Sequence, residues 1–220
     1  MNAADSAGLL LSGIEVAGTL AFALSGFIEA TRKRMDIVGV AAVTFFAAFG
    51  GGTLRDLLLD HRPFFWVRHS GYVWIVLAMV VVGSVWLRAV HLSPSARPML
   101  WADALGLGLF SASGSGMAWE IGQPAIVCAL MGVVTGVFGG VMRDVLCNEV
   151  PATFRDHRPY AICAFAGAWA FLAVASTIGA GWQALVAGVL VTAGLRIAAL
   201  SRGWRVPGWA GERDDEPQGD

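Results

Sequence analysis

Gly51–Asp56 carries the sequence Gly-Gly-Thr-Leu-Arg-Asp, and Gly139–Asp144, which begins 88 positions later, carries Gly-Gly-Val-Met-Arg-Asp. The same spacing, without gaps, pairs identical residues on both sides of this motif: Gly18 with Gly106, Phe22 with Phe110, Ser25 with Ser113, Gly26 with Gly114, Pro63 with Pro151 and Tyr72 with Tyr160. Glu15 is paired with Asp103, which is also a carboxylate. The chain therefore contains two copies of one unit, which have diverged but kept their register.

The residues around the motif are too apolar for a soluble domain. Hydrophobic residues make up 56% of the chain and charged residues 14%, whereas soluble domains carry about 25% charged residues. A helix needs about 20 apolar residues to cross a bilayer, and seven segments approach that length. These segments are Leu9–Glu29, Ile37–Leu58, Gly71–Arg88, Leu100–Trp119, Pro124–Cys147, Tyr160–Ile178 and Gln183–Leu200. We therefore expect an all-α membrane protein with seven transmembrane helices.

Each copy of the unit contains three of these segments. Because three is odd, the second copy must enter the membrane from the opposite side, which makes an inverted-topology repeat. We expect the first three-helix repeat at residues 9–90, a linker at 91–99, the second three-helix repeat at 100–178 and a seventh helix at 182–200. Residues 1–8 are expected to form an extracellular tail and residues 201–220 a disordered cytoplasmic tail. Inverted repeats are typical of proteins that move solutes, although a duplication can also serve packing alone.

The positive charges of the loops predict the orientation. Arg62 and Arg68 fall on the side that holds the N-terminus. Arg32–Arg34 and the arginines of the third loop, the fifth loop and the C-terminal tail fall on the other side. Since Lys and Arg accumulate in cytoplasmic loops, we expect the N-terminus outside and the C-terminus in the cytoplasm, with the chain in the inner (plasma) membrane of the cell.

The repeated glycines lie inside the second and fifth segments. Glycine weakens a helix by about 1 kcal/mol relative to alanine, so each run predicts a break that frees main-chain carbonyl oxygens. Freed carbonyls end a half-helix, where the dipole is negative and attracts cations. An ion path would then be lined by the glycines, the neighbouring phenylalanines and the paired serines: Phe49, Gly50, Gly51, Gly52, Phe138, Gly139, Gly140, Ser25 and Ser113. The alternatives are close helix packing for the glycines and hydrogen bonds back to the helix for the serines.

Ionisable residues near the ends of the segments form a second pattern. Ionisable groups inside membranes usually pair with one another or line a water-filled cavity. We expect Glu15 near Arg55 and Asp103 near Arg143, as equivalent pairs. Together with the acidic residue that follows each arginine, they would wall two vestibules: Glu15, Arg55, Asp56, Asp103, Arg143 and Asp144. The alternative for the arginines is snorkelling to the lipid headgroups.

The doubled Gly-Gly-x-x-Arg-Asp motif, in two three-helix repeats followed by a seventh helix, resembles the prokaryotic TRIC family, the trimeric intracellular cation channels and their bacterial relatives. This family has also been labelled a glycine transporter domain. The resemblance covers residues 14–200. It implies a homotrimer in which each subunit has its own pore, permeable to K+ and, less selectively, to Na+. It also implies pore-lining helices kinked at Gly50–Gly52 and at Gly139–Gly140, although Phe138 stands where the first copy has Gly50.

The leading functional hypothesis is therefore a passive K+-permeable channel that contacts only ions, membrane lipids and other copies of itself. The alternative is a secondary transporter of a small zwitterion such as glycine, because helix ends can hold a zwitterion as well as a cation. We expect no enzyme, no cofactor and no metal beyond the permeating cations, since His61, His69, His91 and His157 lack metal-ligand spacing. A formal net charge of −1 argues against nucleic acid as a partner.

Overall fold

The computed structural model describes residues 3–90, 95–155 and 159–206, and these residues form helices and no strand. The helices are α1 (Ala3–Arg32), α2 (Ile37–Leu58), α3 (Phe65–Arg68), α4 (Gly71–Val90), α5 (Ala96–Glu120), α6 (Ala125–Leu146), α7 (Ala152–Arg155), α8 (Ala161–Ile178) and α9 (Trp182–Arg202). The helices α3 and α7 are single turns that follow α2 and α6. The other helices correspond to the seven expected segments.

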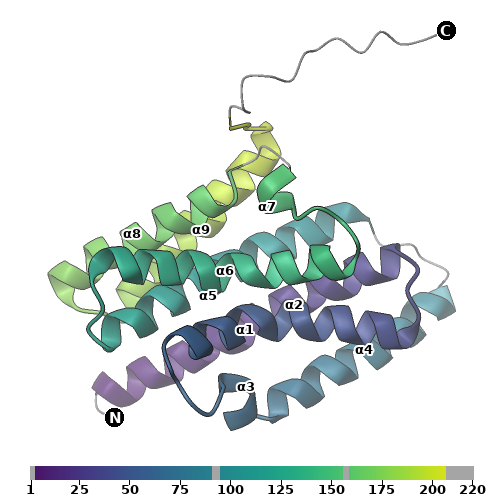
Figure 1. Ribbon diagram of the computed structural model, residues 1–220, viewed down its shortest axis with the longest axis horizontal. Helices are drawn as coiled ribbons and strands as arrows, with labels where there is room; N and C mark the ends of the chain where they lie inside the picture. Colours follow the sequence, from purple (N-terminus) through teal and green to yellow (C-terminus); the bar gives the residue numbers. More distant parts are fainter. Residues whose placement is uncertain (1–2, 91–94, 156–158, 207–220) are drawn as a thin grey trace, which may run out of the picture.

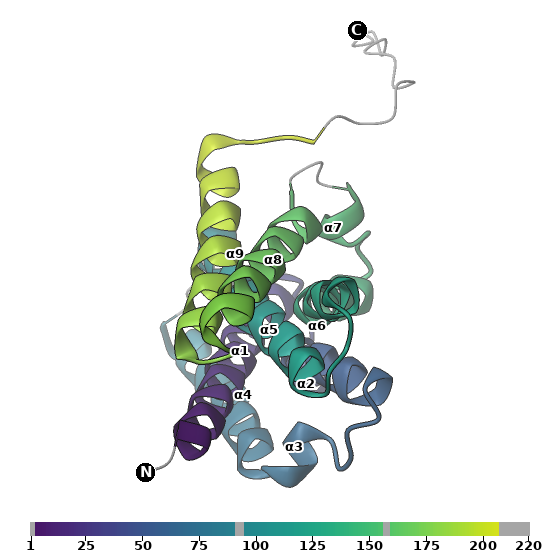
Figure 2. The ribbon, with the colours of Figure 1, turned by 90° about the vertical axis from the view of Figure 1, so that its left-hand side faces the viewer.

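Most of the long helices have the composition of membrane spans. Within the described part of the chain, five are long and apolar enough to cross a bilayer: α1, α2, α6, α8 and α9. Gly71–Leu87 of α4 forms a shorter apolar helix. The remaining long helix, α5, is less apolar because it lies in the middle of the bundle (Figure 2), packed against α1, α6, α8 and α9. Its glycines and serines therefore face protein instead of lipid.

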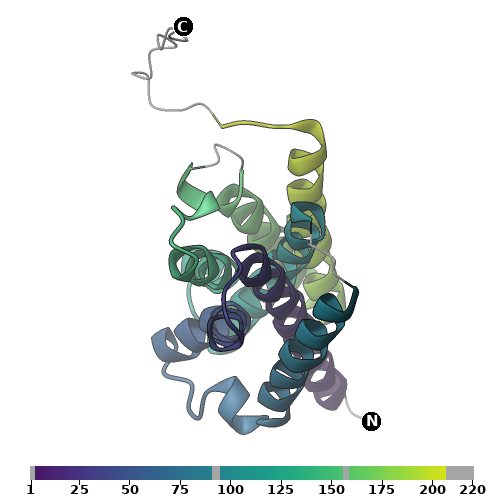
Figure 3. The same cartoon turned by 90° about the vertical axis from the view of Figure 1, so that its right-hand side faces the viewer.

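The long helices alternate in direction along the chain (Figure 1). Helices α1, α4, α6 and α9 run one way, and α2, α5 and α8 run the other way. Helices at equivalent places in the two copies, such as α1 and α5, therefore run in opposite directions. The edges of the bundle differ, since α4 lies at one edge and α8 with α9 lies at the opposite edge (Figures 1 and 3).

Equivalent helices pack against each other at the centre of the bundle. Helix α1 contacts α5, and α2 contacts α6. The rings of Phe22 and Phe110 stack with centroids 5.6 Å apart. Gly106 leaves room for the ring of Phe22, and Gly18 leaves room for the ring of Phe110. The contact of Gly18 with Phe110 and that of Gly106 with Phe22 are related by the 88-residue spacing, so the core is built from two matching halves.

The ends of two helices differ from the expected boundaries. Helix α1 begins at Ala3, inside the expected tail at residues 1–8. Helix α5 begins at Ala96, inside the expected linker. Pro98 does not prevent this start, because the N–H groups of the first helical turn have no partner within the helix. Most of the expected tail, residues 207–220, lies outside the described residues.

Candidate functional site

Arg55 is at the centre of the first of two buried charge clusters. It lies on α2 and its side chain is fully buried. Its Nη1 lies 2.8 Å from Oε1 of Glu15 on α1, and its Nε donates a hydrogen bond of 2.9 Å to Oδ1 of Asp56. The same Nη1 donates a hydrogen bond of 2.8 Å to the hydroxyl of Ser113 on α5. The other oxygen of Asp56 accepts a hydrogen bond from the backbone N–H of Phe65, which fixes the start of α3. One guanidinium therefore joins α1, α2 and α5.

Arg143 is at the centre of the second cluster and is also buried. It lies on α6, and its Nη1 lies 2.5 Å from Oδ1 of Asp103 on α5. Its Nε donates a hydrogen bond of 2.8 Å to Asp144, and its Nη1 donates one of 2.5 Å to the hydroxyl of Ser25 on α1. Asp144 accepts a hydrogen bond from the backbone N–H of Ala152 at the start of α7. This guanidinium joins α1, α5 and α6.

The two clusters match at the 88-residue spacing. The structure contains both ion pairs that the sequence predicted, Glu15 with Arg55 and Asp103 with Arg143. The sequence did not reveal that each arginine would bind the serine of the other copy. The spacing paired Ser25 with Ser113, but nothing in the sequence indicated which arginine would lie beside which serine. The two copies are therefore tied together at both clusters.

The burial of these charges is costly unless each has partners. Moving an ion into a low-dielectric interior costs several kcal/mol, which ion pairs and additional hydrogen bonds offset. The side chains of Glu15, Asp56, Asp103 and Asp144 are all buried as well. In this conformation neither cluster is open to solvent, so the arginines do not snorkel to the membrane surface.

The expectation of a helix break at the glycines is wrong for this conformation. Helix α2 is continuous from Ile37 to Leu58 and α6 is continuous from Ala125 to Leu146, so both run unbroken through the glycines. The carbonyl oxygens that a break would free stay within regular helix. The alternative reading, close helix packing, is what the structure shows.

The packing is closest where α2 crosses α6. A Cβ on Gly139 would lie 2.6 Å from the carbonyl oxygen of Ala47, and a Cβ on Gly51 would collide with the carbonyl oxygen of Thr135. These two contacts are equivalent at the 88-residue spacing. Only glycine lets the two backbones approach so closely, and this favourable packing keeps the helices regular.

The remaining residues of the expected ion path make packing contacts, and one of them, Gly140, borders the second charge cluster. Phe49 is buried against Phe65, with ring centroids 5.9 Å apart. Gly50 faces Met142 and Phe138 across the same crossing of α2 and α6. Gly52 lies against the ring of Phe65, and Gly140 lies against the hydroxyl of Tyr160 and the carboxylate of Asp103. The structure thus brings Gly50, Gly51 and Gly139 together at one crossing, whereas Gly52 and Gly140 pack against other side chains. Phe49 is also held in packing contacts.

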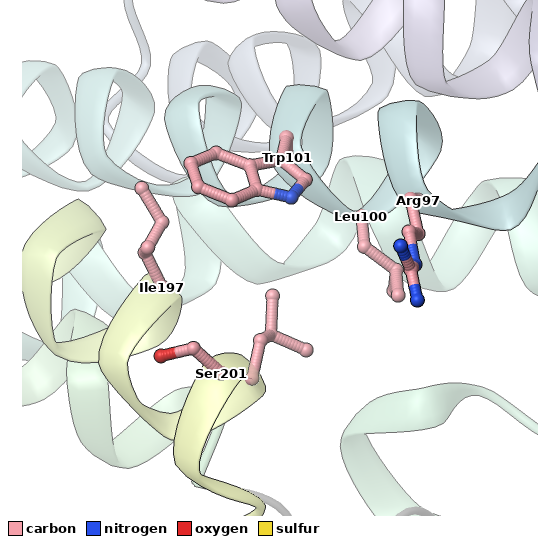
Figure 4. A pocket seen from close by; sticks show the side chains of 6 residues that line it. Arg97, Leu100, Trp101, Ile197 and Ser201 are labelled. Carbon is pink, nitrogen blue, oxygen red and sulfur yellow. The ribbon is translucent and has the colours of Figure 1, made fainter.

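Other features do not supply a competing site. No group of His, Cys, Asp and Glu residues within the described ranges could hold a metal ion. A groove of about 400 Å³ lies between the start of α5 and the end of α9 (Figure 4), and Trp101 on α5 faces Ile197 and Ser201 across it. None of the expected site residues lines this groove.

Comparison with known proteins supports the two-copy architecture. The family model described as "Glycine transporter" matches residues 13–88 and again residues 100–176. One similar protein is a UPF0126 membrane protein of Vibrio cholerae, 33% identical over 87% of this chain and 79% of that protein. Another is the UPF0126 inner membrane protein YadS of Escherichia coli K12, 32% identical over 92% of this chain and 97% of that protein.

Solved structures of similar chains have the same fold. A TRIC trimeric intracellular cation channel orthologue from Rhodobacter sphaeroides is 34% identical, with a TM-score of 0.81 over 89% of this chain and 99% of that chain. A second TRIC cation channel, solved to explain conductance, is 33% identical, with a TM-score of 0.79 over 92% and 98%. The chain is thus similar along most of its length to multi-pass membrane channels and not to enzymes.

Proposed function

This chain belongs to the TRIC family, whose model carries the description "Glycine transporter", and we propose that it is a K+-permeable monovalent cation channel. The observation that carries the proposal is the pair of equivalent charge clusters, each of which ties the two copies together through one buried guanidinium. Ionisable residues inside membranes usually face an ion pathway or a proton relay. The resemblance in sequence and fold to TRIC cation channels supports a pathway for cations.

The ion path of the proposal runs between α1, α2, α5 and α6, with one cluster near each end. It is lined by the glycines and phenylalanines at the crossing of α2 and α6 and by Ser25 and Ser113. Arg55 and Arg143 close it in this conformation, because each guanidinium is buried and donates a hydrogen bond to a serine of the other copy. Opening requires each arginine to leave the serine of the other copy, after which Glu15 and Asp103 attract cations into two vestibules.

The assembly and orientation of the proposal follow from the family and from the charges of the loops. The two copies form inverted repeats, and each subunit of a homotrimer carries its own pore. The N-terminus is outside and the C-terminus is cytoplasmic, in the inner membrane. The opposite directions of α1 and α5 support the inverted arrangement, and the TRIC orthologue described as trimeric supports the trimer.

A flux assay on the purified protein in liposomes separates this function from transport of glycine. Liposomes loaded with KCl are diluted into a K+-free buffer, and K+ release is followed with valinomycin and empty liposomes as controls. We expect K+ release that does not saturate up to about 0.1 M K+ and no concentrative uptake of labelled glycine. Saturable glycine uptake without K+ release would instead make the protein a secondary transporter.

A further inference from the structure

Arg196 is a buried guanidinium that the two charge clusters do not explain. It lies on α9, and only 1% of its surface is exposed. Its Nε and Nη1 atoms have no hydrogen-bond partner within the described part of the chain, and none of the ion pairs found there includes it. Its guanidinium carbon lies over the ring of Tyr160, 4.6 Å from the ring centroid. A cation–π contact compensates only part of the cost of burying a charge, so this arginine calls for an electrostatic explanation.

Tyr160 connects Arg196 to the second cluster. A Cβ built on Gly140 would lie 2.9 Å from the hydroxyl of Tyr160 and 3.3 Å from Oδ1 of Asp103, so both groups border the same point. The hydroxyl of Tyr160 thus borders the Asp103 carboxylate, while the guanidinium of Arg196 lies over the ring of the same tyrosine. Arg196 therefore adds a positive charge to the surroundings of the Arg143 cluster, although it makes no direct ion pair there.

Among the described residues, the first cluster has no second buried guanidinium in the place of Arg196, since α9 has no equivalent in the first copy. Tyr72, the equivalent of Tyr160, stacks instead on the ring of His69, with centroids 5.3 Å apart. Glu15 and Asp56 share the single guanidinium of Arg55, which leaves one carboxylate charge in excess. Asp103 and Asp144 share Arg143 and have Arg196 in addition, which makes the second cluster neutral.

We infer that Arg196 makes the two ends of the proposed ion path electrically unequal, so that the channel passes more K+ when the ions enter from the Arg55 end. This inference rests on the proposed function. An excess unit charge about 10 Å from an ion changes its energy by roughly 0.4 kcal/mol in water and more than that near protein, which is enough to enrich cations about twofold or more. Salt screens this effect, because the Debye length falls from about 10 Å at 0.1 M to about 3 Å at 1 M.

The test is the unitary current of the reconstituted protein at equal positive and negative voltages, in symmetric KCl at pH 8. In 0.1 M KCl we expect currents of opposite sign to differ by about twofold, and in 1 M KCl we expect them to be equal. Arg196→Gln should bring the ratio in 0.1 M KCl close to one, because it leaves one excess carboxylate at each end. Arg196→Lys should keep the ratio of the unmodified protein.

Two further variants keep the inference falsifiable. Thr192→Val alters a buried neighbour on α9 without changing charge, and its current ratio should equal that of the unmodified protein. Glu15→Gln makes the first cluster neutral, so it should also bring the ratio close to one, whether or not Arg196→Gln folds. Unequal currents that persist in folded Arg196→Gln or in Glu15→Gln would overturn the inference, and so would equal currents of the unmodified protein in 0.1 M KCl. A protein that shows no openings at all would instead contradict the proposed function.

Discussion

Arg55 and Arg143 each bind three kinds of partner. These are a carboxylate on the first helix of the same copy, the acidic residue that follows the arginine in the chain, and a serine of the other copy. The sequence was sufficient to predict the first kind, because Glu15 and Arg55 lie near the same end of two adjacent spans. The serine contacts could not be predicted, since they depend on how the two copies sit side by side. The arginine–serine hydrogen bond nevertheless occurs in both clusters, so it is a feature of the repeated unit.

The hydrogen bond to Ser113 is expected to hold the closed state. A hydrogen bond to a charged group contributes about 1.5–3 kcal/mol, and about 1.4 kcal/mol corresponds to a tenfold change in an equilibrium. Ser113→Ala should therefore raise the open probability in single-channel records by about tenfold. Ser115→Ala is the matched control on α5, because the hydroxyl of Ser115 has no hydrogen-bond partner among the described residues. An open probability that rises equally in both variants would show that the contact with Arg55 is not what holds the closed state.

Removal of the buried guanidinium should affect stability more than gating. Arg55→Gln leaves Glu15 and Asp56 buried without their counter-charge, which costs about 3–5 kcal/mol. We expect a clear fall in the thermal denaturation midpoint in detergent, as monitored by intrinsic fluorescence.

Lys33→Gln provides the control for loss of a positive charge. The hydrogen bond and charge of Glu149 raise the pKa of Lys33, but this pair is exposed and screened by water, so the midpoint should not change. Equal midpoints for both variants would contradict the importance of burial.

At the scale of helices, the glycine runs are the point where sequence and structure differ most. Helix propensity alone favours a break at Gly50–Gly52, and the same residues also suit a close crossing of two helices. The structure distinguishes a helix break from a close crossing, because Gly139 approaches the carbonyl of Ala47 and Gly51 approaches that of Thr135. Sequence patterns located the spans themselves well, because α2 and α8 end at the residues where the apolar runs end.

The close packing of α2 against α6 should be disrupted when a methyl group is added where the two helices cross. In Gly139→Ala the new Cβ meets the backbone oxygen of Ala47, which cannot move away as a flexible side chain could. We expect a lower thermal midpoint in detergent, by several degrees, from overpacking of about 1–3 kcal/mol. Gly194→Ala on α9 adds the same methyl group with nothing within 4 Å, and its midpoint should stay the same or rise. A drop of equal size in both variants would contradict the packing role of the crossing.

At the scale of the whole molecule, α9 is what makes the two halves differ. In the first copy Tyr72 is part of α4 and is only partly buried. In the second copy Tyr160 is buried, and Arg196 of α9 lies over its ring. The sequence indicated that the last span lies outside the repeat, since the two copies account for three spans each and leave the seventh over. It did not indicate where α9 would pack, because an apolar helix with one arginine inside it and another at its end fits several faces of a bundle.

The orientation of the molecule is tested with reporters fused to its ends. Because the side that holds Arg32–Arg34 carries most of the positive charge, a C-terminal green fluorescent protein should fluoresce and a C-terminal alkaline phosphatase should be inactive. Active phosphatase at the C-terminus would place the Arg55 end of the bundle in the cytoplasm and reverse the predicted orientation.

The central claim, that the two joined copies enclose a path for cations, is tested most directly by single-channel recording in a planar bilayer under a tenfold KCl gradient. The account predicts discrete openings whose current reverses near the equilibrium potential of K+, because the carboxylates of both clusters favour cations over Cl−. Openings that reverse near the equilibrium potential of Cl− would contradict it. It would also be contradicted if the folded protein and its variants Ser113→Ala and Ser25→Ala all showed no openings.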